Sequence, residues 1–325
     1  MRASKNPLVS IILPTKNNDR TINECLKSVF SLNYPKKEVI IVDGHSADDT
    51  ILIASKYNSK IIYENKGTRA GACNEGIKIA KGGIIAFTDA DCTVGKTWLD
   101  DLVLALDRDE GIVCATGPNA IPSDLDGFSK AVGLALSTPL GGGPSTHSKV
   151  LTEKKYVNSA PGCNAVYYKD IFDKIGLFDE SLITAEDADL NQRLKERGYK
   201  ILYVPSAKVF HYHRTTLRTF FKQIHRYAIG RAQLVKKDKK ALEWIHILPS
   251  LELIGIIILL LLALKWPILF IIIIGLIMSY FIVILAFSTH LVIKNKLSFK
   301  MYIFLVLIFI TEFFGWSLGF IRGLV

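Results

Sequence analysis

Three long apolar segments close this chain, and they restrict its possible folds more than any other feature. They cover residues 244–264, 268–287 and 301–320. Each is close to the roughly 20 residues that cross a bilayer as a helix. Because an isolated segment in lipid must satisfy its own backbone polar groups, we expect three membrane-spanning helices. Pro249 and Glu252 interrupt the first segment, which makes it the least regular of the three.

The charges around these segments predict an orientation. The second connecting loop contains Lys294, Lys296 and Lys300, whereas the first contains only Lys265. Basic loops stay on the cytoplasmic side of a membrane. With a cytoplasmic N-terminus, three spans place the basic loop on that side, whereas two spans would place it outside. The N-terminal apolar run, residues 8–13, is too short for a signal peptide. We therefore expect a multi-pass protein of the cell membrane with its soluble part in the cytoplasm. Glu312 lies mid-span, where a functional role and a protonated packing role are both open.

Upstream of these segments, apolar strands alternate with helices. We expect strands over residues 8–13, 38–43, 60–63 and 84–87, and helices over residues 22–29, 48–57 and 71–80. Strands of this kind are buried on both faces, so the pattern predicts an α/β domain with a mostly parallel sheet. Ligands bind beyond the carboxyl ends of the strands in such sheets. Thr15, Asp43 and the pair Asp89 and Asp91 lie at those ends, which predicts one site there.

Composition and charge exclude several classes of protein. The five cysteines are odd in number and form no C-x-x-C pair, so we expect no disulfide framework, no structural zinc site and a reducing compartment. The net charge is +10, but no nucleic-acid module is recognisable, and we expect no nucleic-acid partner. Many of the basic residues lie over residues 214–240, beside the apolar segments, where they would attract anionic membrane lipids.

Residues 216–234 predict an amphipathic helix. Its apolar residues share one helical face: Leu217, Phe220, Phe221, Ile224 and Ala228. Arg218, Lys222 and His225 lie elsewhere on the helix. A helix of this pattern either packs on a protein core or lies in the membrane interface, and the neighbouring apolar segments favour the interface.

The acidic pair Asp89 and Asp91 predicts a metal site. Alternate residues of an ideal strand point to opposite faces, so the chain must turn at Asp89 for both carboxylates to share one ion, and Ala90 is small enough to allow the turn. Oxygen ligands favour Mg²⁺ or Mn²⁺, which would stabilise the charge of a leaving diphosphate. A solvated pair of loop acids is the alternative.

Glu186 and Asp187 precede a helix beginning near Asp187. They would either cap that helix or act as a general base that removes a proton from a hydroxyl. Asp43 would bind a nucleobase or stabilise the turn over residues 43–46. Arg69 would neutralise a base or phosphate or be a surface charge. His211 and His213 flank Tyr212, and one of them would be a third metal ligand or a structural histidine.

These motifs together resemble the inverting glycosyltransferases of family 2, which have the GT-A fold. The resemblance covers roughly residues 6–235 and is strongest to the membrane-tethered type of succinoglycan synthesis. It rests on five ordered stretches: PTKNN at 14–18, IVDGHSADDT at 41–50, AFTDAD at 86–91, GLFDE at 176–180 and EDADLNQRL at 186–194.

The resemblance implies a role for each matching residue. Pro14, Thr15, Asp43, Arg69 and Asp89 would bind the nucleotide-sugar. Asp89, Asp91 and His211 would hold the metal, and Asp187, with Glu186 beside it, would be the catalytic base. Gln223 and Arg226 match the Q-x-x-R-W signature of processive members, although Tyr227 replaces the tryptophan. With His213 and Arg214, these two residues would contact the acceptor or the diphosphate.

The resemblance also implies a domain plan and a function. We expect a GT-A domain over residues 1–214, an interfacial helix and basic linker over 215–240, and a membrane region over 241–325. The enzyme would move a sugar from a UDP- or GDP-sugar to a polyprenyl- or dolichol-linked saccharide, with inversion, for glycan or exopolysaccharide assembly. A polyprenyl-phosphate sugar synthase, a processive polysaccharide synthase and a non-catalytic nucleotide-binding subunit are the alternatives.

Overall fold

A computed structural model describes residues 6–125, 127–143 and 151–325 of the 325-residue chain. Its first part alternates strands and helices as predicted: β1 (Val9–Thr15), α1 (Ile22–Phe30), β2 (Lys37–Asp43), α2 (Thr50–Ala54), β3 (Lys60–Tyr63), α3 (Arg69–Ile79) and β4 (Ile84–Phe87). The predicted strands are confirmed to within one or two residues. The second helix is shorter than the expected 48–57, and α3 begins two residues before the expected 71.

The middle of the chain adds shorter elements. They are β5 (Cys92–Val94), α4 (Trp98–Ala105), β6 (Ile112–Thr116), β7 (Asn119–Ala120), α5 (Gly127–Leu136), α6 (Pro139–Gly142), β8 (Lys155–Val157), β9 (Ala165–Tyr168), α7 (Ile171–Ile175), α8 (Glu186–Glu196), β10 (Lys200–Tyr203) and β11 (Val209–His211). The chain closes with α9 (Leu217–Lys237), the 3₁₀ turn η1 (Lys239–Ala241), α10 (Trp244–Ala263), α11 (Leu269–Asn295) and α12 (Phe299–Leu324).

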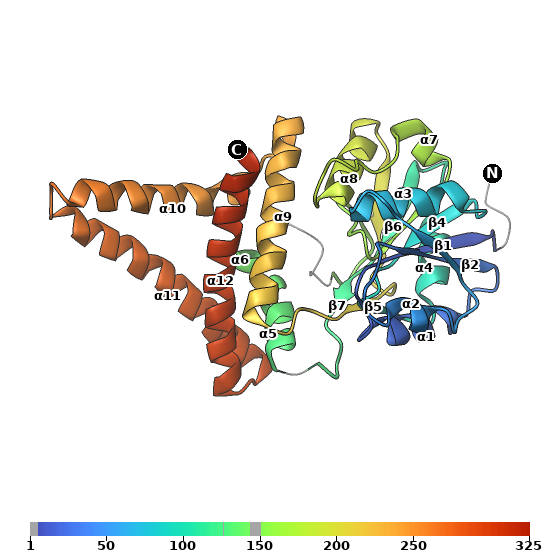
Figure 1. Ribbon diagram of the computed structural model, residues 1–325, viewed down its shortest axis with the longest axis horizontal. Coiled ribbons are helices and arrows are strands. Elements are labelled where there is room, and N and C mark those ends of the chain that lie inside the picture. The colour runs from blue at the N-terminus through green and yellow to red at the C-terminus, as the bar shows by residue number, and fades with distance from the viewer. Residues whose placement is uncertain (1–5, 126, 144–150) are drawn as a thin grey trace. The chain divides into compact units, whose positions relative to one another are not determined.

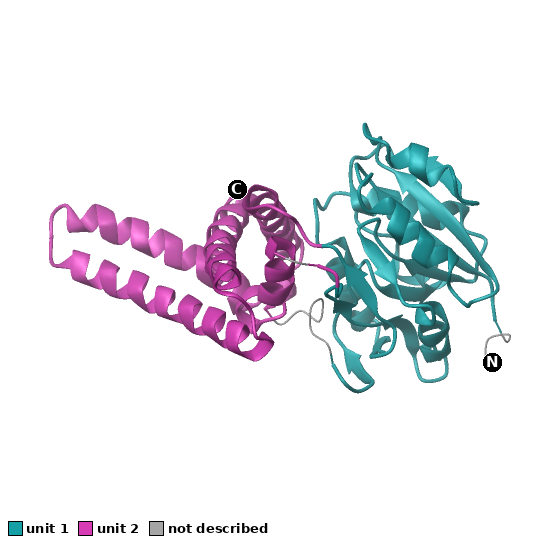
Figure 2. Ribbon diagram, turned by 90° about the horizontal axis from the view of Figure 1, so that it is seen from below, with its two compact units in different colours: residues 1–123, 144–212 teal, residues 124–143, 213–325 magenta. Residues whose placement is uncertain are grey.

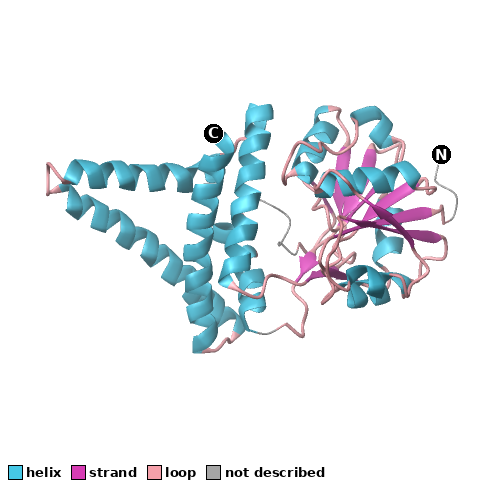
Figure 3. Cartoon of the chain, viewed as in Figure 1, coloured by secondary structure: helices cyan, strands magenta, loops and turns pink. Residues whose placement is uncertain are grey.

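An eight-stranded sheet in the order β3-β2-β1-β4-β9-β6-β10-β8 forms the centre of the first part. Strands β1 to β4 are parallel, whereas β9 runs antiparallel to both its neighbours and β8 is antiparallel to β10. Helices cover both faces of this sheet (Figure 1, Figure 3). A mixed α/β sheet of this kind confirms the predicted fold class.

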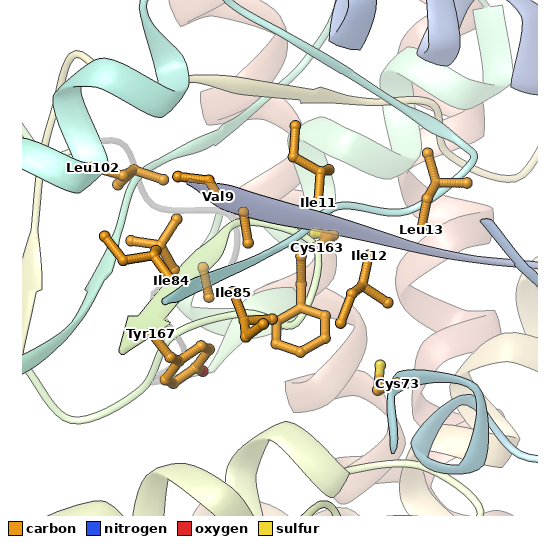
Figure 4. Packing of buried hydrophobic residues seen from close by; sticks show 14 of the residues in the cluster. Val9, Ile11, Ile12, Leu13, Cys73, Ile84, Ile85, Leu102, Cys163 and Tyr167 are labelled. Carbon is orange, nitrogen blue, oxygen red and sulfur yellow. The ribbon is translucent and has the colours of Figure 1, made fainter. Parts of the chain in front are cut away.

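The buried core explains why the central strands are apolar throughout. All seven residues of β1 are buried. Ile11 and Leu13 point to one side of β1, and Ile12 points to the other side, toward Cys73 of α3 (Figure 4). Gly76 of α3 packs so closely over β1 that an added Cβ would lie within 3.1 Å of the Ile12 side chain. Both faces of β1 are therefore inside the protein, as a doubly covered sheet requires.

A second, three-stranded sheet in the order β5-β11-β7 lies apart from the first. Strand β11 pairs antiparallel with β5, which places His211 opposite Cys92, and parallel with β7. This small sheet joins the segment just after Asp91 to a segment more than a hundred residues later in the chain.

The chain divides into two compact units (Figure 2). Unit 1 comprises residues 1–123 and 144–212, and unit 2 comprises residues 124–143 and 213–325. The predicted boundary at 214 is close to the end of unit 1. The sequence did not predict that α5 and α6 belong with the C-terminal helices, against which α5 packs through Phe128 and Phe304.

In unit 2, α10, α11 and α12 are long and apolar enough to cross a membrane. They begin and end near the three predicted segments, except that α11 continues to Asn295. The structure corrects the prediction for the apolar face of α9. Phe220, Ile224 and Ala228 are buried by protein, because that face packs along α12. The core-packing alternative therefore holds for this face.

Three glycines of α12 allow the close packing with α9. Gly315, Gly319 and Gly323 recur every four residues and share one helical face. An added Cβ would lie 3.3 Å from Ile224 at Gly315, 2.9 Å from the Ala228 Cβ at Gly319 and 2.7 Å from the Ala232 Cβ at Gly323. Small residues at this spacing let two helix backbones approach closely.

Candidate active site

Arg69 is the centre of a cluster of charged groups at the carboxyl end of the sheet. Its Nε and Nη2 donate to Asp89 Oδ1 at 3.1 and 2.7 Å, and its Nη1 donates to Glu186 Oε1 at 3.0 Å. Its Nη2 also donates to the Gly162 carbonyl at 2.8 Å. The guanidinium fork thus ties together three segments that are far apart in the sequence.

Local structure explains why these groups meet. Arg69 is the first residue of α3, whose preceding Thr68 accepts a hydrogen bond from the Gly71 N–H at 3.0 Å and caps the helix. Asp89 follows the end of β4, and Glu186 is the first residue of α8. Gly162 leaves room for this guanidinium, because an added Cβ would lie 2.6 Å from Arg69 Nη1 and displace it.

Burial sets the electrostatics of this cluster. The Glu186 side chain is 8% exposed, and those of Arg69 and Asp89 are about a quarter exposed. Burial raises the pKa of Asp89 to about 6, against the opposing effect of the Arg69 guanidinium. Burial also raises the pKa of Glu186, again opposed by Arg69 and reinforced by the neighbouring Asp187 carboxylate. Burial thus opposes the ionised form of both carboxylates, and the Arg69 guanidinium favours it.

Asp187 lies beside this cluster but is held differently. Its Oδ2 accepts from the Gly162 N–H at 3.1 Å, and its Oδ1 accepts from the Ala188 N–H at 2.7 Å. The side chain remains partly exposed. Ala185, just before the two acids, has a φ of +68°, an uncommon conformation for a residue with a Cβ. Two backbone N–H groups thus orient the Asp187 carboxylate. Among the described residues, no cationic side chain is bonded to it.

Asp91 lies next to His211 at the edge of the small sheet. The Asp91 Oδ1 is 3.4 Å from His211 Nε2, and the Asp91 carbonyl accepts a hydrogen bond from the Tyr212 N–H at 2.9 Å. Burial alone would lower the pKa of His211, but the Asp91 carboxylate outweighs it and raises the pKa to about 9. The pairing of β5 with β11 is what brings the histidine to the acid.

A divalent metal fits the donors at this point. One donor atom each of Asp91, Cys92 and His211 lie within 4.8 Å of one another. A carboxylate oxygen and an imidazole nitrogen are suitable ligands for Mn²⁺. Asp89 is not a member of this group, since its carboxylate is bonded to Arg69. The predicted metal role of Asp91 and His211 thus has matching geometry, and the metal role of Asp89 stays a prediction.

The predicted nucleotide-binding residues lie at the ends of β1 and β2, where they support turns. Asp43 is buried and accepts from the Ser46 N–H at 2.9 Å and the Ser46 hydroxyl at 2.6 Å. The Thr15 hydroxyl donates to Asn18 Oδ1 at 3.2 Å, and Pro14 is buried within β1. The turn role of Asp43 is therefore present, and nucleotide binding by these residues and by Arg69 stays a prediction.

The four predicted acceptor residues belong to unit 2. The Ser129 hydroxyl lies 3.2 Å from the carbonyls of both His213 and Arg214, and can donate to either. On α9, the Gln223 Nε2 donates to the Tyr227 hydroxyl at 2.9 Å, and Arg226 is exposed. Their part in the site stays a prediction.

Two residues of the site escaped sequence reasoning. Cys92 joins the candidate metal group, and its position directly after Asp91 was the available signal. Gly162 contacts Arg69 and Asp187, but no motif marks it. Its loop is held by the buried Asn164, whose Oδ1 accepts from the Trp98 Nε1–H at 2.8 Å.

Comparisons with known proteins show which proteins this chain is similar to. The chain matches the model of the family described as Glycosyl transferase family 2 over residues 10–176. The dolichyl N-acetyl-alpha-D-glucosaminyl phosphate 3-beta-D-2,3-diacetamido-2,3-dideoxy-beta-D-glucuronosyltransferase of Methanococcus voltae is 28% identical over an alignment of 256 residues. This alignment covers 73% of this chain and 77% of that protein. Glycosyltransferase AglE of Haloferax volcanii is 27% identical over 257 residues, covering 77% of this chain and 81% of that protein.

A solved structure shares the fold over nearly the whole chain. The mannosyltransferase PcManGT from Pyrobaculum calidifontis, in complex with GDP-Man and Mn²⁺, aligns with a TM-score of 0.57 and 18% identity. The alignment covers 95% of this chain and 88% of that protein. It extends beyond unit 1 and therefore includes much of the C-terminal helical region.

Proposed function

Because this chain belongs to glycosyl transferase family 2, we propose that it moves a sugar from a nucleotide-sugar to a lipid-linked saccharide with inversion of the anomeric carbon. The observation that carries this proposal is the cluster around Arg69, where Asp89, Glu186 and the Gly162 loop that orients Asp187 converge at the carboxyl ends of the strands. The chain is a glycosyltransferase with a GT-A-like catalytic domain and three apolar C-terminal helices.

Asp187 is the proposed general base. Of the two adjacent acids, Glu186 is buried and paired with Arg69, whereas Asp187 accepts only backbone N–H groups among its described contacts. In this mechanism a hydroxyl of the acceptor passes its proton to Asp187 as its oxygen attacks the anomeric carbon. Arg69 and Glu186 hold the Gly162 loop and the start of α8 in place, so that the base is positioned before the acceptor arrives.

Asp91 and His211 would hold a divalent cation, Mg²⁺ or Mn²⁺. When bound, the ion would neutralise charge on the leaving nucleoside diphosphate. The solved PcManGT structure contains GDP-Man and Mn²⁺, which supports a nucleotide-sugar donor and a metal for this chain. Thr15 and Asp43 would contribute to nucleotide binding at the ends of β1 and β2.

A lipid-linked acceptor is supported by two observations. The Methanococcus voltae relative is named for a dolichyl phosphate-linked sugar. Three helices of this chain are long and apolar enough to cross the membrane in which such a lipid resides. In this proposal the enzyme acts in glycan assembly at the cytoplasmic face of the cell membrane.

The test uses the full chain in detergent, with Mn²⁺, a panel of UDP- and GDP-sugars, and a lipid extract. We expect nucleotide release that requires both metal and lipid. Asp91→Ala and Asp187→Asn should each reduce transfer by at least about a hundredfold, as expected when a base or metal ligand is lost. Only Asp91→Ala should weaken metal-dependent nucleotide binding. Asp173→Asn, which changes an exposed acid of α7, is the matched control.

Several results would contradict the proposal. Near-normal transfer by Asp187→Asn would indicate an acceptor that needs no deprotonation, such as a polyprenyl phosphate. Products longer than one added sugar would indicate a processive synthase. Nucleotide binding without transfer under any pairing would indicate a non-catalytic subunit.

A further inference from the structure

Cys92 is a nucleophilic side chain at the candidate metal site that the proposed function does not use. It is the first residue of β5 and pairs directly with His211 of β11. Residues directly opposite each other in an antiparallel pair point to the same face, with Cβ atoms about 4.5 to 5.5 Å apart. The strand register alone therefore places the thiol beside the imidazole, and the preceding residue supplies the carboxylate.

The separations between the donor atoms resemble those around a bound ion. The Asp91 Oδ1 lies 3.4 Å from His211 Nε2 and 3.8 Å from Cys92 Sγ. With metal–ligand distances of about 2.3 Å for sulfur and about 2.1 Å for nitrogen and oxygen, a tetrahedral site separates O from N by about 3.4 Å and O from S by about 3.6 Å. The Asp91–His211 pair matches this geometry, and the Asp91–Cys92 pair is about 0.2 Å longer. The donor atoms of Cys92 and His211 lie within 4.8 Å of each other.

The surroundings of these donors also suit a bound cation. Cys92 is 1% exposed and His211 is 7% exposed, whereas Asp91 is partly open to solvent. Two of the three donors are thus already removed from water, and the carboxylate marks the open side. Three protein ligands with one open position are typical of catalytic rather than structural zinc sites.

We propose that Asp91, Cys92 and His211 form a three-ligand site for a thiophilic divalent cation, such as Zn²⁺, Co²⁺ or Cd²⁺, with the Cys92 sulfur as a direct ligand. Thiolate and imidazole ligands favour these ions over Mg²⁺, which prefers oxygen. On binding, the Cys92 thiol and the His211 imidazolium each release a proton to solvent, and the sulfur and a neutral ring nitrogen form bonds to the ion. The fourth position is left for water or for a phosphate oxygen. Such ions would compete with Mg²⁺ or Mn²⁺ for the same place.

The experiment titrates Co²⁺ into the metal-free full chain in detergent and records its absorption spectrum. A sulfur ligand produces an intense near-ultraviolet charge-transfer band that oxygen and nitrogen ligands do not. We expect this band to saturate at one equivalent of Co²⁺ and to be lost in Cys92→Ser. Cys114→Ser removes a thiol that is equally buried, in β6 and outside the donor group, and should keep the band.

Two outcomes would overturn the proposal. The first is that the unaltered protein binds Co²⁺ without a charge-transfer band. This result does not depend on whether any variant folds. The second is a band that persists in Cys92→Ser and disappears in Cys163→Ser, which would assign the sulfur to the other cysteine. The titration contains no nucleotide-sugar, so failure of the transfer assay would leave this inference unaffected.

Discussion

Arg69 makes four hydrogen bonds to three partners, and each one uses the planar fork of its guanidinium. A lysine keeps the positive charge but presents a single ammonium, so it would not reach Asp89, Glu186 and the Gly162 carbonyl at once. We expect Arg69→Lys to lower the rate constant for sugar transfer by about 10- to 100-fold, a magnitude typical of residues that orient catalytic groups. Steady-state kinetics with saturating donor would measure it.

The control for this prediction is Arg108→Lys. Arg108 makes an equally good fork with Asp170, at 2.9 and 2.8 Å, but on the exposed surface. Its replacement should leave transfer within about twofold, because exposed ion pairs contribute little to stability. Equal losses in both variants would mean that Arg69 acts through general stability and not through the site.

At this scale the sequence predicted which residues matter better than it predicted their partners. The acids at strand ends were found from their positions, because a parallel sheet brings its carboxyl ends together. The bond between Arg69 and Asp89 was not found, because it depends on how α3 packs over β1 and β2, with β4 the next strand of the sheet. The contribution of Gly162 was also missed, because it acts through its backbone, and a backbone carbonyl has no sequence signature.

Among the helices, α9 and α12 pack closely because three glycines of α12 face α9. Gly319→Ala would bring a Cβ to 2.9 Å from that of Ala228, and into the backbone of α9. We expect a loss of about 1 to 3 kcal/mol, as for other overpacked interiors, and a midpoint of thermal unfolding lower by several degrees. Differential scanning fluorimetry in detergent would measure the change.

Gly275→Ala of α11 is the matched control, because an added Cβ there meets no atom within 4 Å. It should leave the midpoint unchanged or raise it slightly, since alanine favours a helix over glycine by about 1 kcal/mol. If Gly319→Ala behaves like Gly275→Ala, the two helices are not packed as described.

Between strands, Glu38 links β1 and β2 to the turn before β4. Its carboxylate accepts from the Ser10 hydroxyl at 2.5 Å and from the Lys81 N–H at 2.6 Å. Burial opposes ionisation, but these hydrogen bonds outweigh it and lower the pKa of Glu38. The resulting stability is present above the unfolded-state pKa of about 4.3 and is lost as the pH falls through the lower folded-state value.

We therefore expect Glu38→Gln to reduce the free energy of unfolding by about 1 kcal/mol at pH 7. The difference from the unaltered protein should shrink as the pH falls below about 4. Thermal unfolding across a pH series would test this, with the exposed Glu153→Gln as control. A difference that stays constant with pH would show that the charge of Glu38 is not involved.

The elements themselves were predicted well where their pattern was regular. The apolar strands β1, β2 and β4 and the three long apolar helices agree with their periodicity and length. The antiparallel strand β9 between β4 and β6 was not predicted, because strand order is not encoded in local periodicity. The apolar face of α9 was expected to face the membrane interface, but it packs on α12, whose glycines allow the close approach.

At the scale of the whole chain, a labelling test would determine whether and in which direction the three apolar helices cross a membrane. All five cysteines are buried, so a cysteine introduced into a connecting loop would be the readily labelled thiol. In intact cells, Asn295→Cys at the C-terminal end of α11 should resist a membrane-impermeant maleimide and react only after the cells are opened. Trp266→Cys, between α10 and α11, should react in intact cells.

This pattern follows from three spans with the basic loop in the cytoplasm. The reverse pattern would place the basic loop outside. Labelling of both positions in intact cells would mean that α11 does not cross. The unaltered protein, with only buried thiols, provides the background.

The packing of α9 against α12 has a consequence for the order in which the chain is made. A ribosome releases α9 well before α12, with α10 and α11 between them. At about 5 to 20 residues per second, the buried face of α9 waits several seconds for its partner. A membrane surface would be a suitable temporary cover for Phe220 and Ile224. We therefore expect the apolar face of α9 to bind the membrane surface during biosynthesis. This face would leave the membrane surface once α12 has been made and packs against it.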